Sequence, residues 1–90
     1  MEFKNTIEMM MSEDYKERFK AEYYQTKIRY ERLKKFNTKI EAAKATNFMK
    51  NAVEMPNHDC PSDLLREQQR VMGEYLHLLE VRAVIENIEL

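Results

Sequence analysis

The scarcity of residues that interrupt helices is the feature that most constrains the fold of this chain. Its 90 residues include one glycine and two prolines, and both prolines lie between residues 50 and 61. A β-sandwich or β-barrel needs a tight turn about every 8 to 12 residues, and such turns depend on glycine and proline. The sequence therefore predicts an all-α protein, and its length accommodates one domain, residues 1–90.

The expected domain has four parts: an N-terminal arm (1–11), a first helical region (12–48), a linker (50–61) and a second long helix (62–89). Ser12 and Ser62 are each followed by acidic residues, a pattern typical of a helix N-cap. The arm lacks a sustained period, although Phe3, Ile7 and Met10 lie at helical spacing and could form a short docking helix. We expect an antiparallel hairpin of two long helices with this short N-terminal segment.

The second long helix carries apolar residues on two adjoining stripes. One stripe is Leu64, Val71, Leu78 and Ile85, which recur every seven residues, and the other is Leu65, Met72, Tyr75 and Leu79. Two helices that touch along one line cannot bury so wide an arc, so we expect the hairpin to assemble into a homo-oligomer. Gly73 lies within the arc, where either a close helix approach compensates for its low helix propensity or the position is simply tolerated.

The first helical region contains a core stripe and, beside it, a polar face with aromatic ends. The core stripe is Phe19, Tyr23, Thr26, Tyr30 and Leu33, and the adjacent face is Tyr15, Arg18, Glu22, Gln25, Arg29, Arg32 and Phe36. Both sets step by three and four residues, which places each on one side of a helix. The cations of the polar face are arginines, whose planar guanidinium groups form bidentate hydrogen bonds and stack on rings.

Charge is distributed unevenly along the chain. Residues 15–44 contain ten basic and four acidic side chains, whereas the remaining residues sum to −7. The net charge of −1 argues against a dedicated duplex-DNA-binding protein, which is usually strongly basic. The uneven distribution permits two interpretations, complementary helices packed together or an anion site on the basic helix. Likewise, Arg18 and Glu22 lie at i and i+4, where such residues often form only weak surface pairs.

Four residues of the polar face are the best candidates for ligand binding, because guanidinium groups bind phosphates and aromatic rings stack on bases. They are Tyr15, Arg18, Arg29 and Arg32. Tyr15 and Arg29 are about 21 Å apart along one helix, too far for one small ligand. An antiparallel pair of first helices would bring Tyr15 of one chain to Arg29 or Arg32 of the other. Glu22 and Gln25 would lie near the two-fold axis, and the pocket would suit a ligand with two-fold or pseudo-two-fold symmetry.

Catalytic and metal-binding motifs are not visible in the sequence. It has no phosphate-binding loop, paired-carboxylate site, serine triad or metal cluster, so we expect no catalytic residue, metal or cofactor. Cys60 is the only cysteine, and with His58 it supplies two of the roughly four ligands of a structural zinc site. No segment approaches the roughly 18 apolar residues that span a bilayer, and no signal peptide is recognisable. We expect a soluble protein of the cytoplasm.

Two runs of residues carry a resemblance to a known family. They are Asp14-Tyr15-x-x-Arg18-Phe19-x-x-Glu22 with Arg29, Arg32-Leu33 and Phe36, and Leu64-Leu65-x-x-Gln68-x-x-x-Met72-x-x-Tyr75-Leu76-x-x-Leu79-x-x-Arg82. Together they cover about two thirds of the chain and resemble a family of short phage proteins. That family includes the anti-CBASS sponges, which sequester the cyclic oligonucleotide signals of bacterial immunity.

The resemblance implies a helical homohexamer that binds cyclic dinucleotides, and in some members cyclic trinucleotides at separate sites, without cleaving them. It matches the ligand contacts of the family to Tyr15 and Arg29, with Arg32 as their neighbour. Three features depart from the family. Thr26 stands where leucine is usual, Arg29 and Arg32 stand where lysine is usual, and the connection over residues 37–61 is long.

The resemblance thus predicts a phage-type immune-evasion protein that acts in the host cytoplasm. The expected ligand-binding residues are Tyr15, Arg18, Arg29, Arg32 and Phe36. The expected partners are cyclic dinucleotides, or also cyclic trinucleotides, and further copies of the chain, with neither a membrane nor duplex DNA among them. A small helical inhibitor of a host protein and a coiled-coil assembly module are the alternatives.

Overall fold

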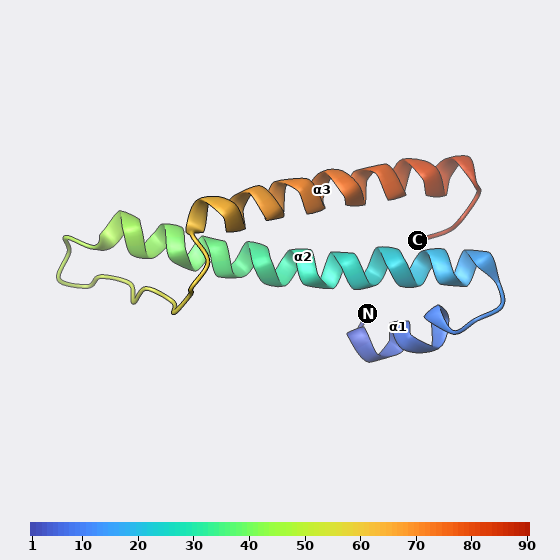
Figure 1. Ribbon diagram of the computed structural model, residues 1–90, viewed down its shortest axis with the longest axis horizontal. Helices are drawn as coiled ribbons and strands as arrows, with labels where there is room; N and C mark the ends of the chain where they lie inside the picture. Colours follow the sequence, from blue (N-terminus) through green and yellow to red (C-terminus); the bar gives the residue numbers. More distant parts are fainter.

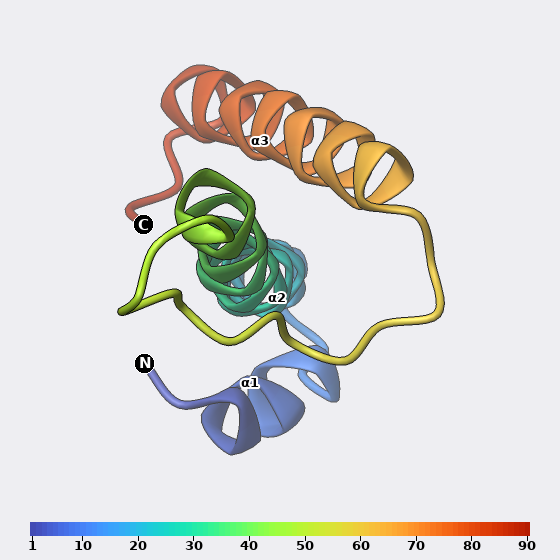
Figure 2. The ribbon, with the colours of Figure 1, turned by 90° about the vertical axis from the view of Figure 1, so that its left-hand side faces the viewer.

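Three helices and no strands make up the protein in the computed structural model, which describes all 90 residues. They are α1 (Phe3–Met10), α2 (Tyr15–Thr46) and α3 (Ser62–Ile85). α3 returns antiparallel to α2, and α1 lies against another side of α2, so α2 is the middle element (Figure 1, Figure 2). The molecule is elongated, with extents of 54 × 25 × 20 Å. The predicted all-α class is confirmed.

α2 begins at a cap formed by Asp14. Its side chain accepts a hydrogen bond from the main-chain N–H of Lys16 at 3.0 Å, which satisfies an amide that has no partner within the helix. The predicted cap at Ser12 is wrong, because the Ser12 hydroxyl instead accepts from the N–H of Asp14 inside the preceding turn. No glycine or proline then interrupts α2 for 32 residues, about 48 Å, and it ends at Thr46 rather than at residue 48.

α3 begins at Ser62 as predicted, but its N-cap differs from the prediction. The main-chain carbonyl of Pro61 accepts hydrogen bonds from the N–H groups of Leu64 and Leu65, and the Ser62 side chain makes no cap. The Ser62 hydroxyl instead accepts from the ammonium group of Lys44 at 2.5 Å. Pro61 is the N-cap residue, and since proline carries no hydrogen-bonding side chain, α3 begins without a side-chain cap. Ser62 therefore ties the start of α3 to the last turn of α2.

α3 ends at Ile85, before the predicted limit at residue 89, because the chain turns back sharply. Asn87 has a φ of 58°, the left-handed conformation that asparagine tolerates better than most residues. The N–H of Ile88 bonds to the carbonyl of Ala83 at 2.8 Å, and the N–H of Asn87 bonds to that of Val84 at 3.4 Å, which is the Schellman arrangement. Ile88 is buried and completes the core beside Ala83. The gain in apolar burial explains why the helix stops early.

The core is the seam between α2 and α3. Its buried cluster consists of Phe19, Tyr23, Leu76, Leu79, Ala83 and Ile88. Gly73 faces Tyr30 of α2, and a Cβ atom at position 73 would lie 3.3 Å from Cε1 of that ring. Of the two explanations for this glycine, close approach of the helices is therefore confirmed.

α1 is a docked helix rather than a loose arm, so the docking alternative for residues 1–11 is the correct one. Thr6 is fully buried, and its hydroxyl donates to the carbonyl of Phe3 at 2.6 Å. On the α2 side, Ala21 is fully buried, and the buried amide of Gln25 reaches the sulfur of Met10 at 3.5 Å. α1 thus covers a side of α2 that α3 leaves open.

The turn between α1 and α2 is held by Arg18. Its Nη1 atom donates to the carbonyl of Ser12 at 2.9 Å and to the carbonyl of Glu13 at 2.8 Å. These carbonyls belong to the turn, where no helix partner is available to them. One side chain on α2 therefore fixes the direction in which α1 folds back.

Tyr23 gives the α2–α3 seam a pH dependence. Its hydroxyl donates to Glu80 at 2.6 Å, and burial together with that carboxylate raises the pKa of Tyr23 to about 12. The unfolded chain releases this proton near pH 10, so the free energy of unfolding should fall as pH rises from about 10 to 12. Urea titrations of wild type and Tyr23→Phe should show a shallower decline in the variant. Tyr30→Phe is the matched control, because Tyr30 also packs against the core cluster while Glu80 accepts from Tyr23. An equal effect of both variants would contradict this assignment.

Arg18→Ala should loosen α1 while leaving the α2–α3 seam intact. Loss of the two hydrogen bonds to the turn should lower the hydrogen-exchange protection of residues 3–10 by about five- to tenfold. Lys20→Ala serves as the control, because Lys20 lies on α2 and pairs only with Glu17. Unchanged protection of α1 in Arg18→Ala would show that the turn does not depend on this side chain.

Candidate ligand-binding face

The polar face predicted on α2 lies between the two helices that flank it. The polar face comprises Tyr15, Arg18, Glu22, Gln25, Arg29, Arg32 and Phe36. Tyr15 and Glu22 contact α3, whereas Gln25 and Arg29 contact α1. The face is therefore partly enclosed at both edges rather than being an open surface of one helix.

Tyr15 stands at the start of α2 with its hydroxyl held by the end of α3. The hydroxyl donates to Oε1 of Glu86 at 2.8 Å and accepts from Nη2 of Arg82 at 2.7 Å. The hydrogen bond to Glu86 is the main cause that raises the pKa of Tyr15. The side chain is 46% exposed and tilts against Phe19, with ring centroids 6.2 Å apart. An exposed ring with a fixed hydroxyl is suited to stacking.

Arg18 does not pair with Glu22, so the interpretation of these two residues as a weak surface ion pair is wrong. Glu22 instead accepts hydrogen bonds from Thr26 at 3.3 Å and from Tyr75 of α3 at 3.1 Å. Arg18 is occupied by the turn before α2. Arg18, although predicted to bind a ligand, thus has a structural role within the chain.

Arg29 and Gln25 lie next to α1. The guanidinium carbon of Arg29 is 6.0 Å from the ring centroid of Phe3, a cation–π contact, and Arg29 remains exposed. Gln25 is only 8% exposed because Met10 covers it. Within one chain, α1 thus lies over Gln25, the residue expected near the two-fold axis of paired first helices.

Arg32 and Phe36 lie further along α2 in different surroundings. Arg32 is exposed beside a shallow depression of about 400 Å³ that it shares with Lys34 and Lys35. Phe36 is half-buried, and its ring meets the edge of His58 from the α2–α3 connection, with centroids 6.1 Å apart. Arg32 is thus available to a ligand, whereas Phe36 supports the connection.

The five predicted ligand-binding residues do not converge within one chain. Tyr15 contacts the end of α3, Arg18 the first turn, Arg29 α1 and Phe36 the connection. Of the hollows that lie along α2 and α3, the one beside Arg32 is lined by a single predicted residue, and the polar hollow beside Asn37 is lined by none. A site that uses both ends of the face therefore needs residues from two chains.

The cations of α2 are not neutralised by the acids of α3. Each of the ion pairs in the structure joins residues within one helix or its immediate flank, and none joins α2 to α3. Arg29 and Arg32 make no ion pair, nor do Lys34 and Lys35 beside them. The basic and acidic segments do pack together, as one of the two interpretations has it, but no ion pair joins them, so the cations in the middle of α2 remain without a partner on α3.

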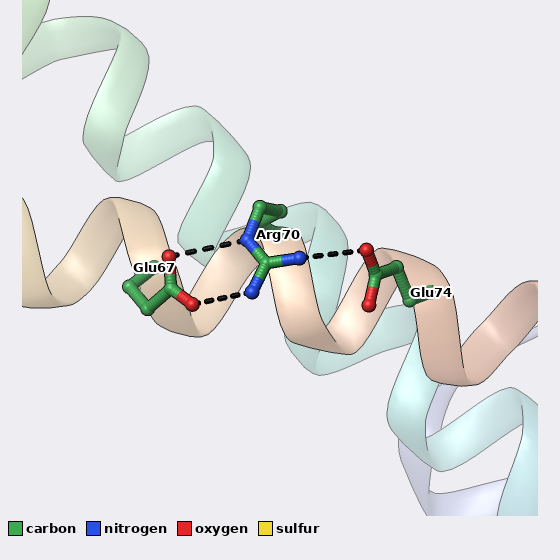
Figure 3. Close-up of polar contacts among 3 residues, drawn as sticks. All are labelled: Glu67, Arg70 and Glu74. Atoms are coloured by element: carbon green, nitrogen blue, oxygen red, sulfur yellow. Dashed lines mark hydrogen bonds and ion pairs between the residues drawn. The ribbon is translucent and has the colours of Figure 1, made fainter.

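The arginines of α3 are held differently, by acids of the same helix. Arg70 lies between Glu67 and Glu74 and donates to the first at 2.5 and 3.1 Å and to the second at 2.6 Å (Figure 3). These carboxylates raise the pKa of Arg70, chiefly through the hydrogen bonds to Glu67. Arg66 pairs with Asp63 in the same way. The positive charge of α3 is compensated locally, and that of α2 is not.

Sequence reasoning missed two features of this region. Arg82 and Glu86 lie behind Tyr15, although their spacing of four residues is a recognisable helix pair. A polar hollow of about 460 Å³ also lies between α2 and α3, and Asn37 lines it. The Asn37 amide donates to Gln69 at 2.9 Å, while its buried Oδ1 has no partner. The signal was present, because Asn37 follows Leu33 by four residues and continues the core stripe.

No group of three or more histidine, cysteine, aspartate or glutamate side chains lies close enough to hold a metal ion. None of the three helices combines the length and the apolar character needed to cross a membrane.

Comparison with known proteins identifies the family. Neither the curated proteins nor the solved structures include a significant match to this chain. Residues 13–85 match the model of the Sequestin family, a span that includes all of α2 and α3. The name agrees with the resemblance to sponge proteins that residues 14–36 and 64–82 carry. Because the match covers most of its length, the chain belongs to the Sequestin family.

Proposed function

We propose that the protein binds cyclic oligonucleotides and sequesters them without cleaving them. Membership in the Sequestin family supports a sequestering role rather than a catalytic one. Within that role, we propose a phage-type immune-evasion protein of the host cytoplasm whose ligands are cyclic dinucleotides, with cyclic trinucleotides as a further class.

The observation that carries this proposal is the presence of exposed arginines without an ion pair, Arg29 and Arg32, on the helix face that also carries the exposed ring of Tyr15. Arg29 and Arg32 have no carboxylate partner, and their guanidinium groups are free to bind phosphate. Tyr15 offers a ring to a base. Phosphates and bases are the two recognition elements of a cyclic oligonucleotide, whereas a protein inhibitor or a coiled-coil module has no need of this pairing.

The proposed site is built from two chains. Tyr15 of one chain would stack on a base, and Arg29 or Arg32 of another would hold a phosphate, since about 21 Å separates Tyr15 from Arg29 within one helix. Because Phe3 lies against Arg29, α1 of the second chain would border the same pocket. Contact between the chains would avoid Gln25, which α1 covers.

Assembly into a homo-oligomer, with a hexamer as the expected form, is supported by the outer face of α3. Leu64, Val71, Leu78 and Ile85 are between 48% and 76% exposed along one side of this helix. A continuous apolar stripe of this kind favours contact with a further surface. We propose that other copies of the chain cover it.

Leu78→Glu should reduce the oligomeric state, because a carboxylate in the middle of the stripe would have to be desolvated in any contact. Light scattering coupled to size-exclusion chromatography should show a smaller mass for the variant than for wild type. Val84→Glu is the matched control, since Val84 is 83% exposed on α3 but lies off the stripe. A wild-type protein that runs as a 10.9 kDa monomer at micromolar concentration would refute the two-chain site.

Cyclic dinucleotides should stabilise the protein against heat, since a ligand that binds the native state raises its stability by mass action. In calorimetric titrations, Tyr15→Ala and Arg29→Ala should each weaken binding by about ten- to a hundredfold. Arg70→Ala should leave affinity unchanged, because Arg70 is engaged by its own helix. Heat denaturation of the complex should release intact ligand, and a linear product would mean that the protein is an enzyme.

Mixing Tyr15→Ala with Arg29→Ala provides a test of the two-chain site. When subunits exchange, some interfaces combine the unmutated side of each chain, so part of the binding should return. A pocket within one chain would recover nothing on mixing. Wild-type affinity in both single variants would place the ligand elsewhere.

A further inference from the structure

The Tyr15 hydroxyl belongs to a closed cycle of three side chains. It donates to Oε1 of Glu86 and accepts from Nη2 of Arg82, and Nε of Arg82 donates to Oε2 of Glu86 at 3.0 Å. Each member of the cycle thus contacts the other two. Of the predicted ligand-binding residues, Tyr15 is the one held in this way by another helix.

The cycle is anchored on buried structure. The guanidinium carbon of Arg82 lies 5.1 Å from the centroid of the buried Phe19 ring. Glu86 is the C-cap of α3 and leads directly into the turn at Asn87. The ammonium group of Lys16 donates to the carbonyl of Asn87 at 3.2 Å, which joins the same turn to the start of α2. The partners of the hydroxyl are therefore fixed to the core, not to a free surface loop.

The cycle leaves the Tyr15 ring accessible while restricting how it moves. A tyrosine side chain whose hydroxyl has two partners cannot rotate freely about its side-chain bonds. An aromatic ring that is already oriented loses less entropy when a ligand stacks on it. The charges of Arg82 and Glu86 also cancel, so the support does not repel an anionic ligand.

We propose that Arg82 and Glu86 are positioning residues that orient the Tyr15 ring for stacking on a ligand base. This inference rests on the function proposed above. Glu86 lies one residue beyond the end of the family match at residue 85, so the match does not by itself assign this role. The segment after α3 thereby becomes part of the binding site without touching the ligand.

A double-mutant cycle tests the proposal. The probe is the tightest binder among cyclic di-AMP, cyclic di-GMP and 3′,3′-cyclic GMP–AMP. Glu86→Ala and Arg82→Ala should each weaken its binding by about three- to tenfold. Tyr15→Phe, which keeps the ring and removes the hydroxyl, should have a similar effect. Combining Tyr15→Phe with Glu86→Ala should weaken binding no further than Tyr15→Phe alone.

Three further variants separate positioning from general stability. Glu86→Gln keeps an acceptor oxygen and should retain most of the affinity. Arg70→Ala and Glu74→Ala alter an arginine–glutamate pair of the same spacing on the same helix, which does not touch Tyr15, and should leave affinity unchanged. In addition, the Cζ resonance of ¹³C-labelled Tyr15 should shift in Glu86→Ala without ligand, since this carbon reports on the hydroxyl.

The outcomes distinguish this inference from the proposed function. If Tyr15→Ala weakens binding but Glu86→Ala and Arg82→Ala do not, positioning is overturned and the proposed site stands. Additive losses in the double variant would likewise overturn positioning. If Tyr15→Ala has no effect, or no member of the probe panel binds, the proposed site is wrong and this inference fails with it.

Discussion

The seam between α2 and α3 buries few side chains, and the rest of the structure depends on that limit. Its cluster contains six residues, and only 13 of the 90 residues are buried in all. Two helices in contact along one line leave their outer surfaces to solvent. The two ends of the chain add to the buried surface. α1 covers a further side of α2, and Ile88 folds back against the seam. The outer stripe of α3 remains apolar and uncovered, and the proposed assembly follows from it.

The same seam explains why the charges remain separated. Between α2 and α3, charged donors bond to neutral acceptors, as Lys44 does to Ser62. The carboxylates accept from phenols, as Glu80 does from Tyr23 and Glu22 does from Tyr75. The acids that face the seam are thus satisfied by phenols, while others pair with arginines of α3 itself. Arg29 and Arg32 form no ion pair with these acids, and Glu31 of α2 is the carboxylate that lines the same depression as Arg32.

The sequence predicted the helical elements better than their ends. The core stripe was correct at Phe19 and Tyr23, because a period of three and four residues is a local property of a helix. The caps at Ser12 and Ser62 were not, since several neighbouring groups compete for the same amides and small differences in backbone geometry decide which succeeds. The early end of α3 depended on the burial of Ile88, which no local pattern reports.

The candidate site was predictable in its residue types and less so in its contacts. The run of arginines and the aromatic at Tyr15 are visible in the sequence and carry the resemblance to the Sequestin family. The burial of Gln25 by α1 and the use of Arg18 to hold a turn are not, because both depend on the direction in which α1 folds back. The direction of α1 follows from its packing against α2, which the local sequence does not report.

The sequence by itself determined that the chain is helical, which sides of its helices are apolar or basic, and to which family it belongs. These properties follow from composition and from spacing within one or two helical turns. Only the tertiary structure decided which partner each polar group takes. Tyr15 meets Arg82 and Glu86, which are 67 and 71 residues away in the sequence. This contact requires α3 to pack antiparallel to α2 with one rotation about its own axis and one register along α2. Side-chain packing across the seam sets both, as where the absence of a side chain at Gly73 leaves room for Tyr30.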